Sequence, residues 1–222
     1  MRLPSSDART LLDKRSRQYE ANRTQAEAYL TSRGIPTEAV EEFRIGVVDQ
    51  HPQDFLIGRL SIPYITPSGI LGIKYRCMRD HNCKEVGCPK YLYDDGEEPR
   101  LYNAGATLRS SPLIFICEGE LDAISVQSLT GYPATAVPGA DMWTRHRYWT
   151  RCFAPFPLVV LPADGDKAGK ALAKAVAADL PQLRIAHMPT EQDANSVLAS
   201  EGVTGFMKRC DLEDYIVQEE AN

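Results

Sequence analysis

The sequence contains no apolar run of the roughly 20 residues that a membrane-spanning helix needs. Its first ten residues, MRLPSSDART, also lack the apolar segment of a secretory signal. We therefore expect a cytoplasmic protein with no membrane partner. The six cysteines among 222 residues do not have the regular spacing of a disulfide framework, which predicts reduced thiols.

The chain also lacks the excess of basic residues that many nucleic-acid-binding proteins carry, because its net charge is −5. The charge is unevenly spread: residues 1–112 hold 16 basic and 15 acidic side chains, whereas residues 113–222 hold 9 and 15. Bound cations would offset part of the acidic excess in the second half. The net charge therefore does not exclude a polyanionic substrate.

Two short apolar runs are each followed by carboxylates. LIFIC at 113–117 precedes Glu118, and LVVL at 158–161 leads to Asp164 and Asp166. In a parallel α/β sheet, ligands bind outside the carboxyl ends of the strands. If these two strands are neighbours, three carboxylates meet at one edge, and such oxygen ligands suit Mg²⁺ or Mn²⁺. The alternative is that the acids only stabilise the first turns of the helices that follow.

The second half alternates predicted strands with predicted helices. The strands are expected at 113–117, 134–137, 158–161 and 184–188. Strands separated by helices imply right-handed crossovers and a mainly parallel sheet flanked by helices on both faces. The first half instead predicts short helices and a strand pair at 59–65 and 70–77, joined by a tight turn. The fold class is therefore α/β, with a smaller N-terminal α+β lobe.

The pattern of the second half resembles the TOPRIM domain of topoisomerases, bacterial-type primases and some nucleases. Glu118 matches its first acidic position, DGDKAG at 164–169 its second, and DAN at 193–195 its third. The resemblance implies that Glu118, Asp164 and Asp166 are catalytic and, together with Asp193, bind Mg²⁺ or Mn²⁺. The alternative for Asp193 is that it only caps its helix.

The first half resembles the RNA-polymerase core of bacterial-type primases. AEAYLTSRGIPTEAVEEFRIGVV at 26–48 is similar to the start of that core, RLSIPYITPSGILGIKYR at 59–76 to its strand pair, and PRLYNAG at 99–105 to its turn before the TOPRIM strand. The resemblance implies four segments, which are a peripheral arm or helix at 1–23, a template-binding α+β lobe at 24–111, a TOPRIM domain at 112–210, and a C-terminal tail at 211–222.

The side chains expected to bind single-stranded DNA follow from the primase resemblance. They are Arg59, Lys74, Arg76, Lys90, Arg100, Tyr102 and Asn103. Cationic side chains neutralise phosphates, and aromatic rings stack on bases. The alternative is that these charges only form a solvated surface.

Cys77, His81, Cys83 and Cys88 lie within twelve residues of a polar, turn-rich segment. Cysteine and histidine are the usual ligands of structural zinc. Their spacing, however, matches none of the usual paired zinc motifs. The sequence therefore favours a solvated loop with reduced thiols over a Zn²⁺ site.

The resemblance implies a DNA primase-like nucleotidyltransferase that makes short RNA primers from ribonucleoside triphosphates on single-stranded DNA. Two alternatives are a TOPRIM metal-dependent nuclease and a non-catalytic primase-like replication accessory protein. We expect no room for an amino-terminal zinc-finger domain or, beyond Asp193, for a helical subdomain and a helicase-binding domain. This size suits a phage protein working in the cytoplasm of a bacterial host. Its partners would be a replicative helicase or a separate zinc-finger or helical primase subunit.

Overall fold

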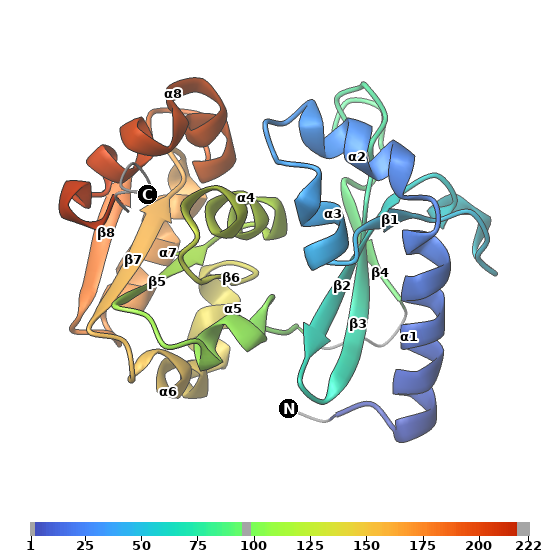
Figure 1. Ribbon diagram of the computed structural model, residues 1–222, viewed down its shortest axis with the longest axis horizontal. Helices are drawn as coiled ribbons and strands as arrows, with labels where there is room; N and C mark the ends of the chain where they lie inside the picture. Colours follow the sequence, from blue (N-terminus) through green and yellow to red (C-terminus); the bar gives the residue numbers. More distant parts are fainter. Residues whose placement is uncertain (1–2, 95–98, 217–222) are drawn as a thin grey trace, which may run out of the picture. The chain divides into compact units, whose positions relative to one another are not determined.

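The computed structural model describes residues 3–94 and 99–216, which fold into two compact units (Figure 1). The first unit comprises Met1–Ser32 and Pro36–Arg100, and the second comprises Arg33–Ile35 and Leu101–Asn222. The sequence placed the boundary between residues 111 and 112. The chain changes unit earlier because Tyr102 forms a β-bridge with Ala136 of the second unit.

The first unit is built on an antiparallel sheet with the strand order β1-β2-β3-β4. Its strands are β1 (Gly46–Val47), β2 (Leu60–Thr66), β3 (Gly69–Arg76) and β4 (Tyr91–Tyr93). Its helices are α1 (Ser6–Glu20), α2 (Arg23–Thr31), α3 (Glu38–Glu42) and the 3₁₀ turn η1 (Asp54–Leu56). The predicted strand pair corresponds to β2 and β3, and β1 and β4 extend it on either side.

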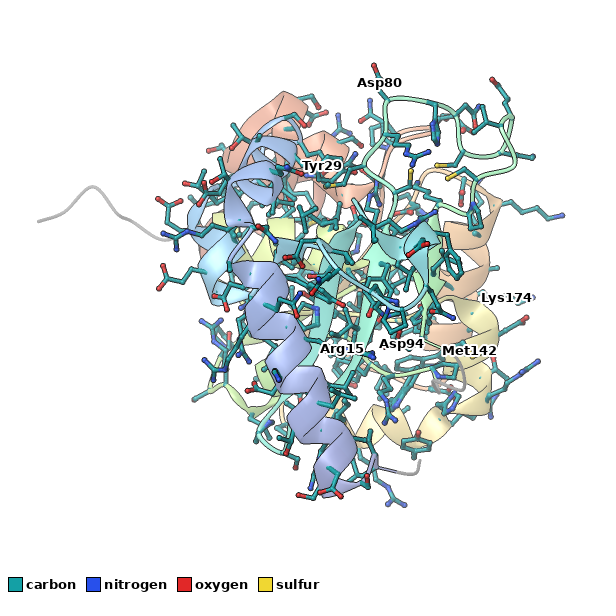
Figure 2. All side chains as sticks on the ribbon, turned by 90° about the vertical axis from the view of Figure 1, so that its right-hand side faces the viewer. Arg15, Tyr29, Asp80, Asp94, Met142 and Lys174 are labelled. Atoms are coloured by element: carbon teal, nitrogen blue, oxygen red, sulfur yellow. The ribbon has the colours of Figure 1, made fainter. Side chains whose placement is uncertain are left out.

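Helix α1 packs along β3 and belongs to the core of the first unit. Its Tyr19 is 1% exposed and meets the ring of Tyr75 edge-on, with 6.4 Å between centroids. Arg15 of the same helix forms an ion pair with Asp94, just after β4, at 3.4 Å (Figure 2). Most of the segment expected at 1–23 as a peripheral arm or helix is therefore a packed helix.

The second unit contains a parallel sheet with the strand order β6-β5-β7-β8 (Figure 1). Its strands are β5 (Leu113–Cys117), β6 (Ala134–Ala136), β7 (Leu158–Ala163) and β8 (Leu183–His187). Its helices are α4 (Glu120–Thr130), α5 (Ala140–Arg145), α6 (Thr150–Phe153), α7 (Lys167–Ala177) and α8 (Ala194–Arg209), with 3₁₀ turns η2 (Ala104–Leu108), η3 (Arg147–Trp149) and η4 (Glu213–Tyr215). The predicted α/β fold is confirmed.

Side chains of the parallel sheet alternate between two helical layers, because successive residues of a strand point to opposite faces. Ile114 and Val159 pack in one cluster with Trp143 of α5 and Leu172 of α7. On the other face, Phe115 lies 5.8 Å, between ring centroids, from Phe206 of α8. Of the helices in the described part of the chain, none is long and apolar enough to cross a membrane.

Candidate active site

Glu118 and Asp164 leave the parallel sheet at the same edge. Strands β5 and β7 are direct neighbours, and their register pairs Leu113 with Leu158 and Phe115 with Val160. The backbone N–H of Asp164 donates a hydrogen bond to Oε1 of Glu118 at 3.4 Å. The two strands expected to lie side by side therefore do so, and their acids meet.

The turn after β7 is held tightly by a neighbouring loop. The N–H of Gly165 donates to the carbonyl oxygen of Gln192 at 2.9 Å. A Cβ atom on Gly165 would lie 1.8 Å from the carbonyl oxygen of Pro189, so only glycine fits at this point of the turn. The close contact fixes the direction in which the flanking aspartates leave the strand.

Helix α7 begins against the two acids. Asp166 is its N-cap residue, and Oδ1 of Asp166 accepts the N–H of Gly169 at 2.9 Å. A Cβ atom on Gly169 would lie 2.2 Å from the carbonyl oxygen of Asp164 and 2.7 Å from Oε1 of Glu118. Glycine at this position therefore allows the first turn of the helix to approach the carboxylates.

Four other carboxylates act electrostatically on Asp164. Burial raises its pKa to about 8, with further contributions from Asp122, Glu118, Asp193 and Asp166. Its Oδ1 atom is buried and has no hydrogen-bond partner within the described residues. Burial also raises the pKa of Glu118, although the hydrogen bond from the Asp164 N–H acts in the opposite direction. A bound cation would stabilise the ionised form of a carboxylate that lies among like charges.

This donor set fits Mg²⁺ or Mn²⁺, because hard cations take carboxylate oxygens. Within the described residues, no three of these acids place their oxygen atoms all within 4.8 Å of one another. One carboxylate oxygen of Asp166 accepts the hydrogen bond that caps the helix. Its second oxygen could bind a cation. Glu118, Asp164 and Asp166 lie at one edge of the sheet, and their role as ligands of the cation stays a prediction.

Asp193 forms a reciprocal cap on α8. Its Oδ1 accepts the N–H of Ser196 at 2.8 Å, and Oγ of Ser196 accepts the N–H of Asp193 at 2.9 Å. The capping role that the sequence left open is therefore present. Asp193 is also one of the charges that raise the pKa of Asp164, so its role as a metal ligand stays a prediction.

Asp122 and Asn195 belong to a hydrogen-bond network next to Asp164. Oδ1 of Asp122 accepts the backbone N–H of Asn195 at 3.0 Å, and Asn195 Nδ2 donates to Oγ of Ser125 at 2.8 Å and to the carbonyl oxygen of Arg33 at 2.9 Å. Asp122 is the first of the charges that act on Asp164. The sequence places Asp122 in the same acidic cluster as Glu118 and predicts that its side chain reaches the edge of the site.

Most side chains predicted to bind DNA are buried. Four of the predicted basic residues are only 7 to 8% exposed: Arg59, Lys74, Arg76 and Arg100. Two further predicted residues support β6: the 2%-exposed Tyr102 pairs with Ala136, and Asn103 Nδ2 donates to the carbonyl oxygen of Ala134 at 2.8 Å. Of the predicted residues, Lys90 is exposed.

Cationic and aromatic side chains face each other across β3 and β4. The register places Lys74 opposite Tyr93 and Arg76 opposite Tyr91. The Lys74 ammonium lies 4.3 Å from the centroid of the Tyr91 ring, and Arg76 donates to the hydroxyls of Tyr91 and of Tyr29 on α2. Together with the exposed Lys90, these strand residues form the β3–β4 patch, defined as Lys74, Arg76, Lys90, Tyr91 and Tyr93.

Cys77, His81, Cys83 and Cys88 come together in the structure. Their potential ligand atoms, one from each residue, all lie within 4.8 Å of one another. Burial raises the pKa of the Cys77 thiol, but hydrogen bonds from the Arg79 backbone and the neighbouring cysteines more than offset this effect and lower it. The sequence favoured a solvated loop with reduced thiols; these cysteines are free, and the clustering of the four side chains is in addition consistent with Zn²⁺.

Comparison with known proteins places these features in context. The Toprim domain family matches residues 113–204. The Gene 57 protein of Mycobacterium phage D29 is 40% identical over 157 residues, covering 68% of this chain and 97% of that protein. A DNA primase of Pseudomonas putida is 28% identical over 164 residues, covering 68% of this chain and 24% of that primase. The structure of a DnaG primase catalytic domain bound to single-stranded DNA is similar with a TM-score of 0.69 and 22% identity, covering 91% of this chain and 80% of that chain.

Proposed function

Because this chain belongs to the family of the Gene 57 protein of Mycobacterium phage D29 and carries a Toprim domain within a DnaG-type primase core fold, we propose that it makes short RNA primers. The substrates are ribonucleoside triphosphates and a single-stranded DNA template, and the reaction is metal-dependent nucleotidyl transfer. The observation that carries the proposal is the half-buried Asp164, surrounded by other carboxylates at the edge of a Toprim sheet.

The acidic edge is the proposed catalytic centre. Glu118, Asp164 and Asp166 hold Mg²⁺ or Mn²⁺ there, with Asp193 as a further ligand. The cation supplies charge neutralisation for the triphosphate and for the phosphoryl group in transfer. The fold of the chain positions the carboxylates. The tight turn at Gly165 and the close contact of the helix start at Gly169 with Asp164 and Glu118 hold them in place.

Asp164 couples cation binding to proton release. With a pKa of about 8, its carboxyl group is largely protonated at neutral pH in the absence of a cation. A carboxylate binds a cation only in its deprotonated form, so binding expels this proton. The raised pKa of the Glu118 carboxyl adds to the same effect.

The β3–β4 patch is the proposed contact for template DNA. Lys90 is exposed and can reach a phosphate, and the 41%-exposed ring of Tyr93 offers a surface on which a base can stack. Arg76 is held by two tyrosine hydroxyls, so it orients Tyr29 and Tyr91. The DnaG catalytic domain of similar fold is bound to single-stranded DNA, which supports single-stranded DNA as the ligand proposed for this chain.

This chain spans only 24% of the length of the Pseudomonas putida primase that it matches. We propose a replicative helicase, or a separate zinc-finger or helical primase subunit, as a partner of this chain in the cytoplasm of a bacterial host.

The test is synthesis by the purified chain. It is incubated with a single-stranded DNA oligonucleotide, labelled ribonucleoside triphosphates and Mg²⁺ or Mn²⁺. We expect short RNA products that require all three components. Asp166→Asn should reduce synthesis by at least about 100-fold, because it removes a ligand charge worth several kcal/mol in the transition state. Asp141→Asn, at an exposed position of α5, is the matched control and should keep the activity.

Two other outcomes identify the alternatives. Degradation of the DNA without synthesis would indicate a metal-dependent nuclease. Intact DNA binding with neither activity would indicate a non-catalytic accessory protein.

A further inference from the structure

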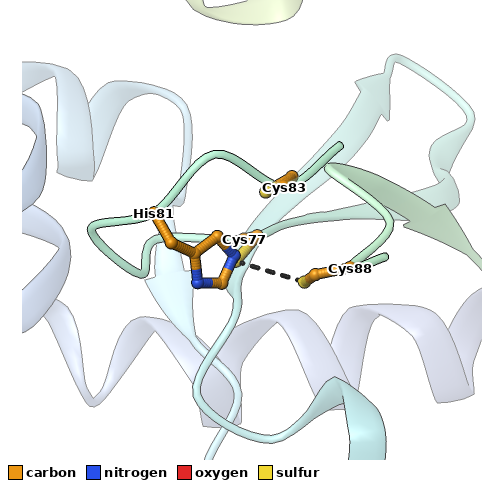
Figure 3. Close-up of side chains that lie close together, drawn as sticks. All are labelled: Cys77, His81, Cys83 and Cys88. Atoms are coloured by element: carbon orange, nitrogen blue, oxygen red, sulfur yellow. Dashed lines mark hydrogen bonds between the residues drawn. The ribbon is translucent and has the colours of Figure 1, made fainter. Parts of the chain in front are cut away.

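Four potential metal ligands converge in the connection between β3 and β4. Cys77 directly follows β3, and Cys88 lies shortly before β4. The Sγ atoms of Cys77 and Cys88 are 3.7 Å apart, and Cys77 Sγ is 3.6 Å from Nε2 of His81. Figure 3 shows Cys77, His81, Cys83 and Cys88 gathered around a common centre. All four ligand atoms lie within 4.8 Å of one another.

These distances fit a tetrahedral zinc ion. Bond lengths of about 2.3 Å to sulfur and about 2.0 Å to nitrogen place neighbouring ligands of a tetrahedron roughly 3.5 to 3.8 Å apart. The two distances from Cys77 lie in this range, and the other pairs need a shift of at most about 1 Å to reach it. The sulfur atoms of Cys77 and Cys88 are too far apart for a disulfide, whose bond measures about 2.05 Å.

The backbone brings the ligands together without any regular helix or strand in the connection. The N–H of Cys77 donates to the carbonyl oxygen of Lys90 at 2.9 Å, which closes the base of the loop. The N–H of Cys88 donates to the carbonyl oxygen of Cys83, also at 2.9 Å. Oδ1 of Asn82 accepts the N–H of Lys84 at 3.1 Å, and this bond stabilises the turn that contains Cys83. The sites of the ligands are thus set by hydrogen bonds of the loop itself.

Arg59 provides a positive charge beside the sulfur atoms. Its guanidinium is 8% exposed and donates to Sγ of Cys88 at 3.5 Å and to the carbonyl oxygen of Pro89 at 2.8 Å. Three thiolates and one Zn²⁺ carry a net charge of −1, which this guanidinium would balance. Such outer contacts orient the ligands of a metal and stabilise their charged form. Arg59 thereby finds a role in the structure other than the DNA contact expected from the sequence.

We propose that Cys77, His81, Cys83 and Cys88 form a structural zinc site that fixes the connection between β3 and β4. All four tetrahedral positions are filled by the protein, and a zinc site without an open position is structural rather than catalytic. The connection carries Lys90 at its end, so the zinc also orders one end of the β3–β4 patch. The proposal does not depend on whether the chain makes primers.

The first test is the zinc content of the full chain, purified without added metal and without a histidine tag. We expect about one zinc ion per chain. Cys83→Ser and His81→Ala should each lower this ratio severalfold, because each removes one of four ligands. Cys152→Ser, a change to a half-buried thiol on α6, is the control and should retain the zinc. Asp166→Asn should also retain it, which excludes binding at the acidic edge.

A second measurement does not depend on how the variants fold. Cobalt(II) replaces zinc in the wild-type chain, and a tetrahedral thiolate site then gives intense visible bands together with sulfur-to-cobalt charge-transfer absorption. We expect this spectrum, and its loss when excess zinc is added. A chain that binds cobalt with the weak bands of an octahedral oxygen site would overturn the proposal. So would a Cys77–Cys88 disulfide, found by mass spectrometry in the freshly purified chain, or zinc content unchanged in both ligand variants.

Discussion

The carboxylate of Asp122 accepts the backbone N–H of Asn195 at 3.0 Å, and this bond joins the first turns of α4 and α8. Both residues are nearly inaccessible, with exposures of 7% and 2%. Asp122 is also the first of the charges that raise the pKa of Asp164. A contact that packs two helices therefore also sets the electrostatics of the acidic edge.

Removing this carboxylate should destabilise the fold. Asp122→Ala leaves the buried N–H of Asn195 without its acceptor, and we expect the free energy of unfolding to fall by about 1.5 to 3 kcal/mol. Asp122→Asn keeps an acceptor oxygen and should lose less. Urea denaturation measures both values, with Asp141→Ala as an exposed control expected within about 0.5 kcal/mol of wild type. Equal losses in the two Asp122 variants would contradict the role of the hydrogen bond.

The raised pKa of Asp164 predicts how stability depends on pH. The carboxyl group has a pKa of about 8 in the folded chain, against 3.8 for an ordinary aspartate carboxyl. Between these values the folded state holds one more proton than the unfolded state, so the free energy of unfolding decreases as pH rises. Asp164→Asn lacks this effect. In buffer free of divalent cations, the stability of wild type relative to Asp164→Asn should therefore fall between about pH 4 and about pH 8.

The control for this pH dependence is the same comparison of wild type with Asp164→Asn in the presence of Mg²⁺. A cation stabilises the ionised carboxylate, so saturating Mg²⁺ should flatten the difference between wild type and Asp164→Asn. Unfolding free energies that run parallel at every pH, with and without Mg²⁺, would show that the carboxyl of Asp164 is not perturbed.

The start of α7 leaves no room for a side chain at Gly169. In Gly169→Ala the new Cβ would meet the Asp164 carbonyl oxygen and Oε1 of Glu118, so the helix must shift. We expect a loss of about 1 to 3 kcal/mol in the free energy of unfolding, together with weaker Mn²⁺ binding in calorimetry. Gly105→Ala is the matched control, because a Cβ there has no atom within 4 Å. Equal effects of the two substitutions would disprove the steric argument.

The β3–β4 patch predicts a salt-dependent contact with single-stranded DNA. Lys90→Ala should weaken binding and reduce the slope of log affinity against log salt concentration by about 0.7, the value for one phosphate contact on a single strand. Lys174→Ala removes an exposed lysine from α7 and should change neither quantity. Fluorescence anisotropy over a salt series measures both. An unchanged slope in Lys90→Ala would remove Lys90 from the template contact.

Arg76→Ala is a less direct probe of the same surface. Its guanidinium is 7% exposed and donates to the hydroxyls of Tyr29 and Tyr91, so the substitution also removes internal contacts. A weaker affinity of that variant for single-stranded DNA could therefore result from a lost phosphate contact, from altered packing, or from both. This difference in burial was not visible in the sequence, where Arg76 and Lys90 are both basic residues near tyrosines.

The sequence by itself predicted the four strands of the second unit and the placement of the acids that follow two of them. Apolar runs such as Leu113–Cys117 form strands because their residues suit a sheet covered on both faces. The acids that follow each run must lie at the carboxyl end of a strand, whatever the order of the strands. Local signals of this kind depend only on neighbours in the chain, and they sufficed to predict the α/β fold and the resemblance to a Toprim domain.

Tertiary structure alone decided which of these residues meet. The order β6-β5-β7-β8 places Glu118 beside Asp164, and the packing of α4 on α8 adds Asp122 to their surroundings. The spacing of Cys77, His81, Cys83 and Cys88 matches none of the usual paired zinc motifs. The pairing of β3 with β4 and the hydrogen bonds of the loop between them nevertheless bring their ligand atoms within 4.8 Å of one another. Such convergence depends on contacts between distant parts of the chain, and spacing in the sequence carries no direct record of it.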